Sequence, residues 1–168
     1  MELEKEATER RDFVGGVLHP TPRPTARHER IVGNIYRRLA EAAEGGVCRV
    51  YMNDMKVRIG DDLVYHPDVM VARGPEPEHP GVETAPCLLV EVFPPETREI
   101  DRREKVAFYP LIPSLKAYLL VEENRPVVER FFRDEKGKWG LAAQFQTGSF
   151  PVPCPETRLS LAEVFEGL

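Results

Sequence analysis

The sequence predicts an α/β or α+β fold in which a central mixed β-sheet is flanked by helices. A nearly continuous apolar run at 87–93 is typical of a central strand that is covered on both faces. Near the N-terminus, Ile31, Ile35 and Leu39 recur at a spacing close to four, which indicates an amphipathic helix. The remaining strand-like segments come in groups and do not alternate regularly with helices, so a doubly wound parallel sheet is not expected.

Each predicted element has a local reason. Residues 13–18 combine apolar residues with two glycines, which predicts a short strand with a bulge or turn. The prolines of 19–24 exclude a helix or central strand there. Thr25 is the predicted N-cap of the first helix, with Ala42 as its last apolar position, and Gly45 and Gly46 end it.

The second half of the pattern follows the same rules. Asp101 and Glu104 have the spacing of a capping box, so a helix is expected to begin there and to end near Pro110. Ser160 and Glu163 predict a second capping box and a short C-terminal helix. The other expected strands are 47–52, 55–59, 65–72, 117–121, 127–133 and 139–144.

Length and composition limit the class of protein. The 168 residues fit one domain, 1–168, in which 1–11 form a charged leader. No apolar run approaches the roughly 20 residues that cross a bilayer, and the N-terminus has no apolar signal segment, so no membrane association is expected. Three widely spaced cysteines (Cys48, Cys87 and Cys154) predict reduced thiols, no zinc site and a cytoplasmic location.

Charge and motifs exclude further classes. The net charge of −5 argues against non-specific coating of nucleic acid, which depends on neutralising phosphates. Neither the G-x-G-x-x-G fingerprint nor a P-loop is present, so a nucleotide cofactor is not expected.

One carboxylate stands inside the central apolar run. Glu91 lies between Val90 and Val92, and a buried carboxylate needs compensation. Asp68 follows Pro67 at the mouth of the preceding long strand, and the loop between the two segments allows them to lie side by side. Two neighbouring carboxylates suit a hard divalent cation such as Mg²⁺ or Mn²⁺. Lys105, expected on the first turn of the next helix, would orient water or stabilise developing charge.

Each of these residues has a plainer explanation when taken alone. Asp68 fits a turn before a strand, Glu91 fits a buried ion pair, and Lys105 fits a solvated helix charge. The combination is more specific than its parts, but spacing alone does not make it diagnostic.

The two segments HPDVMVAR and LLVEVFPPETREIDRREKVAFYPLIPSLKAYLLVEENRPVVERFFR carry a resemblance. They are similar to a bacterial family of proposed restriction endonucleases of unknown function, within the PD-(D/E)XK nuclease-like superfamily. The matching positions are Pro67, Asp68, Val90, Glu91, Val92, Phe93, Pro95, Thr97, Asp101, Lys105, Tyr109, Ile112, Pro113, Ser114, Leu115 and Tyr118, with Pro22, Pro24, Arg27 and His28 upstream. The likeness covers roughly residues 12–165.

The resemblance implies a restriction-endonuclease-like fold and assigns roles. Asp68 and Glu91 match the metal-binding acids of the family. The superfamily's usual lysine position is occupied here by Phe93, and Lys105 matches a lysine displaced onto the following helix. Pro94 and Glu96 replace residues that are serines in the family.

Further candidates have competing explanations. The accessory candidates are His28, Glu29, Asp101 and Tyr109, for which helix-start polarity, capping or packing are the alternatives. For His66, beside Pro67, the alternatives are an outer-shell group of the site and a structural role, and the structural role is expected. Candidate phosphate contacts are Arg27, Arg30, Arg98, Arg102 and Arg103, although a solvated face is the usual reading of such clusters.

Two functions follow. The first is a magnesium-dependent endonuclease that hydrolyses phosphodiester bonds in DNA as a homodimer. The alternative is a catalytically inactive module that keeps the nuclease fold and binds nucleic acid or protein.

Overall fold

The structure is a computed structural model, and it describes residues 11–20, 23–140 and 142–168, apart from the side chain of Arg98. The expected charged leader lies outside this range except for its last residue. Along the chain, the elements are β1 (Arg11–Val14), β2 (Val17–Pro20), α1 (Ala26–Ala43), β3 (Cys48–Met52), β4 (Lys56–Ile59), β5 (Leu63–Tyr65), β6 (Val69–Arg73), β7 (Val82–Glu83), β8 (Pro86–Phe93), α2 (Arg98–Phe108), the 3₁₀ turn η2 (Tyr109–Leu111), β9 (Ala117–Glu122), β10 (Val128–Phe132), β11 (Ala143–Phe145), β12 (Ser149–Pro153), β13 (Glu156–Ser160) and α3 (Leu161–Val164).

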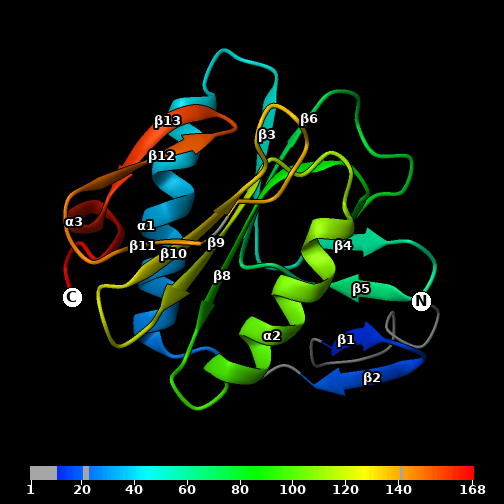
Figure 1. The fold of residues 1–168 in the computed structure, drawn as a ribbon, viewed down its shortest axis with the longest axis horizontal. Helices are drawn as coiled ribbons and strands as arrows, with labels where there is room; N and C mark the ends of the chain where they lie inside the picture. The colour runs from blue at the N-terminus through cyan, green and yellow to red at the C-terminus, as the bar shows by residue number, and fades with distance from the viewer. Residues whose placement is uncertain (1–10, 21–22, 141) are drawn as a thin grey trace.

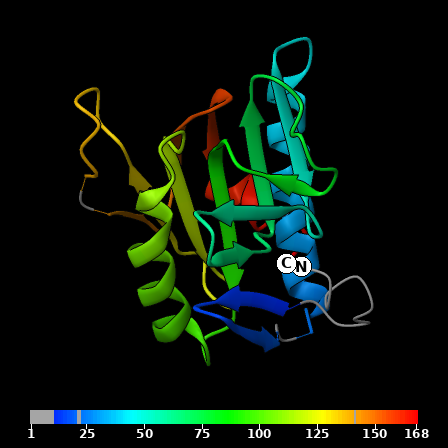
Figure 2. The same ribbon diagram turned by 90° about the vertical axis from the view of Figure 1, so that its right-hand side faces the viewer.

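A six-stranded mixed sheet forms the centre of the fold (Figure 1). Its strand order is β11-β10-β9-β8-β6-β3, in which β8 and β9 are parallel and the other neighbours are antiparallel. Figure 2 shows its strands between α1 and α2. The run at 87–93 is therefore a central strand with both faces covered, as predicted.

A second, five-stranded sheet has the order β2-β1-β5-β4-β7. Val57, Ile59 and Tyr65 from this sheet pack with the α2-side face of the central sheet. β12 and β13 form a separate hairpin against α1. The expectation of one mixed sheet was thus incomplete, because strands too short to show a clear period assemble into two further sheets.

The first helix follows the sequence pattern closely. Ile31, Ile35 and Leu39 are buried against the central sheet, and Thr25 caps the helix by accepting a hydrogen bond from the His28 N–H at 3.0 Å. Ala42 is exposed, so the apolar face ends earlier than expected. Gly45 adopts a φ of 71°, which a glycine tolerates best, just past the end of the helix.

The second helix begins earlier than predicted. Thr97 precedes it, and the backbone N–H of Asp101 donates to the Thr97 carbonyl at 2.9 Å. Asp101 and Glu104 therefore lie inside the helix and form no capping box, so that expectation was wrong. Lys105 consequently lies about two turns into the helix and not on its first turn. The C-terminal box is confirmed, since Ser160 and Glu163 each accept a hydrogen bond from the other's backbone N–H.

The expected strand at 65–72 is two strands in two sheets. β5 ends at Tyr65 in the second sheet and β6 begins at Val69 in the central sheet. The chain crosses between them at His66, Pro67 and Asp68, where proline removes one ladder donor. The expected strand at 139–144 is replaced by β11, with Trp139 making only an isolated bridge to Arg133.

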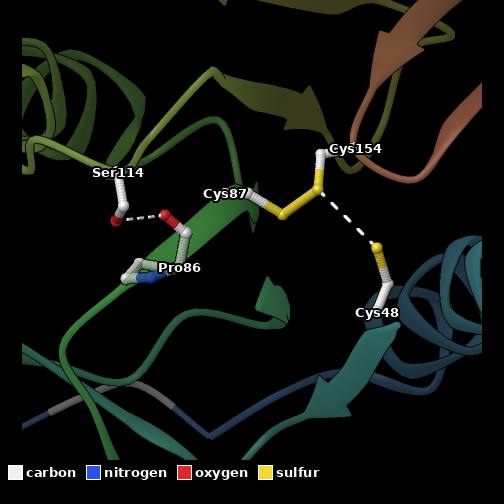
Figure 3. The surroundings of a disulfide bond; sticks show 5 residues. All are labelled: Cys48, Pro86, Cys87, Ser114 and Cys154. Atoms are coloured by element: carbon white, nitrogen blue, oxygen red, sulfur yellow. Dashed lines mark hydrogen bonds between the residues drawn. A yellow bond between two sulfur atoms is a disulfide. The ribbon is translucent and has the colours of Figure 1, made fainter. Parts of the chain in front are cut away.

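Two of the three cysteines are joined, in contrast to the expectation of reduced thiols. Cys87, near the start of β8, and Cys154, between β12 and β13, form a disulfide with a Cα–Cα distance of 6.0 Å (Figure 3). The free thiol Cys48 lies close by, with its Sγ 3.8 Å from that of Cys154. Spacing in sequence could not reveal this proximity, because the hairpin that carries Cys154 was not predicted. The inference from reduced thiols to the cytoplasm therefore has no support.

None of the helices in the described ranges is long and apolar enough to cross a membrane.

Candidate active site

Asp68 and Glu91 meet at the end of the pairing between β6 and β8. Val69 pairs with Val90, so one further step of this antiparallel register puts Asp68 opposite Glu91. Leu88, Val90 and Val92 face the core on the α1 side, whereas Leu89 and Phe93 face the α2 side. Glu91 alternates with the second set and therefore points toward α2.

Both carboxylates line one cavity of about 130 Å³. Its walls come from the first hairpin, the start of α1, the strand ends and α2. The residues concerned are Asp12, Arg23, Pro24, Thr25, His28, His66, Asp68, Glu91, Val92, Phe93, Pro94, Thr97, Asp101, Lys105 and Glu123. The cavity thus collects charged residues from parts of the sequence that are far apart.

The Glu91 carboxylate has two partners on α2 and η2. Its Oε1 lies 3.2 Å from Lys105 Nζ and also accepts a hydrogen bond from the Tyr109 hydroxyl. Burial raises the pKa of Glu91 to about 7, although Lys105 and the Tyr109 hydrogen bond oppose this shift. The charge of Asp68 adds to the increase. Near neutral pH, the carboxyl is therefore poised between its neutral and charged forms.

Lys105 is enclosed although it carries a charge. Its side chain is 8% exposed, and Nζ lies 3.8 Å from Asp12 Oδ2 and 3.9 Å from the centre of the Tyr65 ring. Burial lowers the pKa of Lys105, but Glu91 and Asp12 more than offset this and raise it overall. The ammonium therefore stays charged at neutral pH, and the expectation of a solvated helix charge does not apply.

Asp68 is held by a hydrogen bond from the next strand and by a contact with α1. Its Oδ2 accepts a hydrogen bond from the Val92 N–H at 2.7 Å, and His28 Nε2 lies 3.3 Å from the same oxygen. His28 Nε2 also lies 3.0 Å from the Val92 carbonyl oxygen. Burial lowers the pKa of His28, yet the hydrogen bond and charge of Asp68 raise it overall. His28 thus joins α1 to the central sheet at the acid.

The other accessory candidates are placed differently. Tyr109 is fully buried and contacts Glu91 directly. Asp101 lines the cavity, and burial raises its pKa. The Glu29 side chain is largely exposed, with Oε1 3.7 Å from His28 Nδ1, and lies in the first turn of α1, as its alternative explanation required.

Sequence reasoning missed Asp12 and favoured a structural role for His66 over one in the outer shell of the site. Asp12 Oδ1 accepts a hydrogen bond from the His66 backbone N–H at 3.1 Å and lies 3.0 Å from His66 Nδ1. The hydrogen bond of His66 and the charges of Lys105 and His66 lower the pKa of Asp12 against the effect of burial. A single acid beside a short apolar segment carried no recognisable spacing to the other site residues.

The candidate phosphate contacts are mostly engaged within the protein. Arg27 donates to the Glu123 carbonyl at 2.6 Å, Arg30 to the Gly167 carbonyl at 2.8 Å, and Arg102 to Glu129 Oε2 at 2.8 Å. Arg103 is exposed on α2. The side chain of Arg98 lies outside the described part of the structure.

The donor set fits a hard divalent cation that keeps part of its water shell. Among the described residues, no group of three or more His, Cys, Asp or Glu side chains forms a metal cluster. Mg²⁺, however, is commonly held by one or two carboxylates together with water and phosphate oxygens. The contacts described above fall on Oδ2 of Asp68 and Oε1 of Glu91. Asp68 and Glu91 are the residues that would hold such a cation.

Comparisons with other proteins identify the fold and the family. In a solved structure from Anabaena variabilis, the chain is described as "a putative nuclease belonging to DUF820". It matches with a TM-score of 0.76 and 16% identity, over 98% of this chain and 95% of that chain. This likeness shows that the fold is restriction-endonuclease-like, with mixed sheets and few helices.

Relatives and a family model extend the comparison to the sequence. "Uncharacterized protein sll1609" of Synechocystis is 30% identical over 84% of this chain and 82% of its own length. "Uncharacterized protein slr1290" from the same organism is 27% identical over 83% of this chain and 74% of its own length. The model of the Uma2 family, described as "Putative restriction endonuclease", matches residues 1–162. The chain therefore belongs to the Uma2 family.

Proposed function

We propose that this protein is a metal-dependent endonuclease that hydrolyses phosphodiester bonds in DNA. The observation that carries the proposal is the meeting of Asp68 and Glu91 at one cavity wall, with the Lys105 ammonium 3.2 Å from Glu91. Two carboxylates can hold a metal ion at a phosphate group, and a neighbouring ammonium can stabilise the negative charge that develops there.

In this proposal, Asp68 and Glu91 hold Mg²⁺ or Mn²⁺. The cation, when bound, would polarise the phosphate and lower the pKa of a coordinated water. His28 and the Val92 N–H fix the orientation of Asp68, because both contact the same carboxylate oxygen. Tyr109 fixes Glu91 in the same way. Pre-set acids of this kind need no reorganisation when the substrate arrives.

The superfamily usually has a lysine at the strand position that Phe93 occupies here, and Lys105 takes over its role from α2. Phe93 is buried, so its side chain supplies core packing and not chemistry. From α2, Lys105 reaches the same carboxylate and stabilises negative charge that develops on a phosphate oxygen. The low exposure of Lys105 strengthens this interaction, because little water screens the ammonium.

The proposed substrate is DNA, in line with the description of the family. We expect a two-fold homodimer, because two copies of so small a chain can each cleave one strand of a duplex. Light scattering at working concentration tests this part, and a monomer mass would contradict it.

The direct test is a cleavage screen over duplex, branched and single-stranded DNA with Mg²⁺ or Mn²⁺. We expect cleavage by the wild type and a loss of about 10²-fold or more in Glu91→Gln, since the metal contributes several kcal/mol. Glu96→Gln is the matched control, because Glu96 is exposed in the same connection between β8 and α2. If the wild type neither cleaves nor binds either metal, the inactive binding module is the better account.

A further inference from the structure

We propose that Asp12 is a positioning residue for Lys105. It acts as the second counter-ion that keeps the ammonium neutralised within the site when Glu91 is engaged by the metal. This inference rests on the proposed function and assigns a role to the first hairpin.

The position of Asp12 is fixed from both sides. Phe13 pairs with Val64 in the antiparallel register between β1 and β5, so the next step puts Asp12 opposite Tyr65. The β1–β2 hairpin itself turns at Gly15 and Gly16, both with positive φ, which suits a tight two-residue turn. The hairpin therefore presents Asp12 at a defined place on the cavity wall.

The two oxygens of Asp12 serve different partners. Oδ1 accepts a hydrogen bond from the His66 N–H at 3.1 Å and lies 3.0 Å from His66 Nδ1. Oδ2 lies 3.8 Å from Lys105 Nζ. His66 is two residues before Asp68, the first proposed metal ligand. The Asp12 carboxylate therefore links the backbone near Asp68 to Lys105.

Lys105 needs this second partner for an electrostatic reason. The ammonium is almost fully enclosed, and a buried charge that loses its counter-ion is strongly destabilising. Its nearest acid is Glu91, which is also the proposed metal ligand. Without Asp12, Lys105 would depend on Glu91 and would compete with the cation for that carboxylate. With Asp12, the same ammonium has a second carboxylate partner, whose Oδ2 lies 3.8 Å away.

Other charges around Lys105 do not duplicate this role. Glu104 lies on the same helix and adds attraction without a close ion pair among the described contacts, and the Tyr65 ring offers its face at 3.9 Å. The competing explanation is that Asp12 itself binds the metal. That explanation predicts that the effect of Asp12 on metal affinity is independent of Lys105.

A double-mutant cycle read by calorimetry separates the two. Mg²⁺ and Mn²⁺ are titrated into the wild type, Asp12→Asn, Lys105→Met and the double variant. Asparagine keeps an oxygen to accept the His66 hydrogen bond, removes the charge and replaces the oxygen that faces Lys105 with an amide NH2 group. We expect Asp12→Asn to weaken metal binding about 5- to 10-fold, and to change it less than about 2-fold when Lys105 is already methionine.

Two further variants define the controls. Asp12→Glu keeps the charge, and its metal affinity is expected to lie within about 2-fold of that of the wild type. This variant tests the inference even if Asp12→Asn does not fold. Glu123→Gln removes an equal charge from another carboxylate of the cavity and should act equally with and without Lys105. An equal loss for Asp12→Asn in both backgrounds, or no loss in either background, overturns the inference while the proposed function stands. A wild type that binds neither ion overturns both.

Discussion

The Lys105 ammonium lies 3.2 Å from the Glu91 carboxylate, although one residue is on α2 and the other is in the central strand β8. This contact answers the cost of an acid inside an apolar strand. The answer is incomplete, because the pKa of Glu91 is still raised to about 7 by burial. Lys105 alone does not fully stabilise the charged form of Glu91, so a bound cation would stabilise it further.

Stability should therefore fall with rising pH through Glu91. The pKa of Glu91 is about 7 in the folded protein and has an ordinary value of 4.5. Between these values, the folded state holds a proton that the unfolded state has released, so the free energy of unfolding decreases as pH rises. The free energy of unfolding of Glu91→Gln, measured relative to that of the wild type, should therefore rise by about 1–3 kcal/mol from pH 5 to pH 8. Urea unfolding at both values measures this difference, and equal pH dependence of the two proteins would contradict the prediction.

The Tyr109 hydroxyl should stabilise the charged form of Glu91. Tyr109→Phe keeps the buried ring and removes the hydrogen bond, so we expect a loss of about 1–2 kcal/mol in the free energy of unfolding. The pKa of Glu91 should move further up, because this hydrogen bond lowers it. Carboxyl ¹³C NMR titration checks the second effect. Tyr118→Phe is the control, since Tyr118 is equally buried in the same cluster, and its variant should leave the Glu91 titration unchanged.

The disulfide should be measurable by counting thiols. Denatured, unreduced protein should show one reactive thiol, that of Cys48, and three after reduction. Replacing both Cys87 and Cys154 by alanine should cost roughly 2–4 kcal/mol, because the bond joins residues 67 positions apart. Cys48→Ala is the control and should keep the bond. Three reactive thiols without reduction would show that the pair is not formed in the purified protein.

The arginines should divide into structural and binding groups. Arg30→Ala removes a hydrogen bond to the Gly167 carbonyl and should lower stability without changing DNA affinity. Arg103, exposed on α2, is the candidate contact, and Arg103→Ala should weaken DNA binding and reduce the salt slope by about 1. Fluorescence anisotropy at several salt concentrations distinguishes the two. The opposite ranking of the two variants would mean that α1 and not α2 faces the DNA.

Most of the regular elements could be predicted from the sequence because their causes are local. The apolar run of β8, the periodicity of α1 and the Thr25 cap depend on neighbouring residues alone, and the structure confirms all three. The capping box at Asp101 failed because a D-x-x-E spacing also occurs inside a charged helix, where Thr97 had already begun the first turn. The β12–β13 hairpin was missed because Pro151, Pro153 and Pro155 argue against a strand in that segment.

The sequence by itself determined which acids were candidates, since Asp68 and Glu91 follow from a proline turn, an apolar strand and a family pattern. Only the tertiary structure decided which groups surround them. Lys105 reaches Glu91 because α2 covers the face of the central sheet toward which Glu91 points. Asp12 and His66 lie at the same site because β1 and β5 pair next to the point where the chain crosses into β6. These contacts link residues from distant segments through sheet pairing and layer packing, and no local spacing encodes such distances.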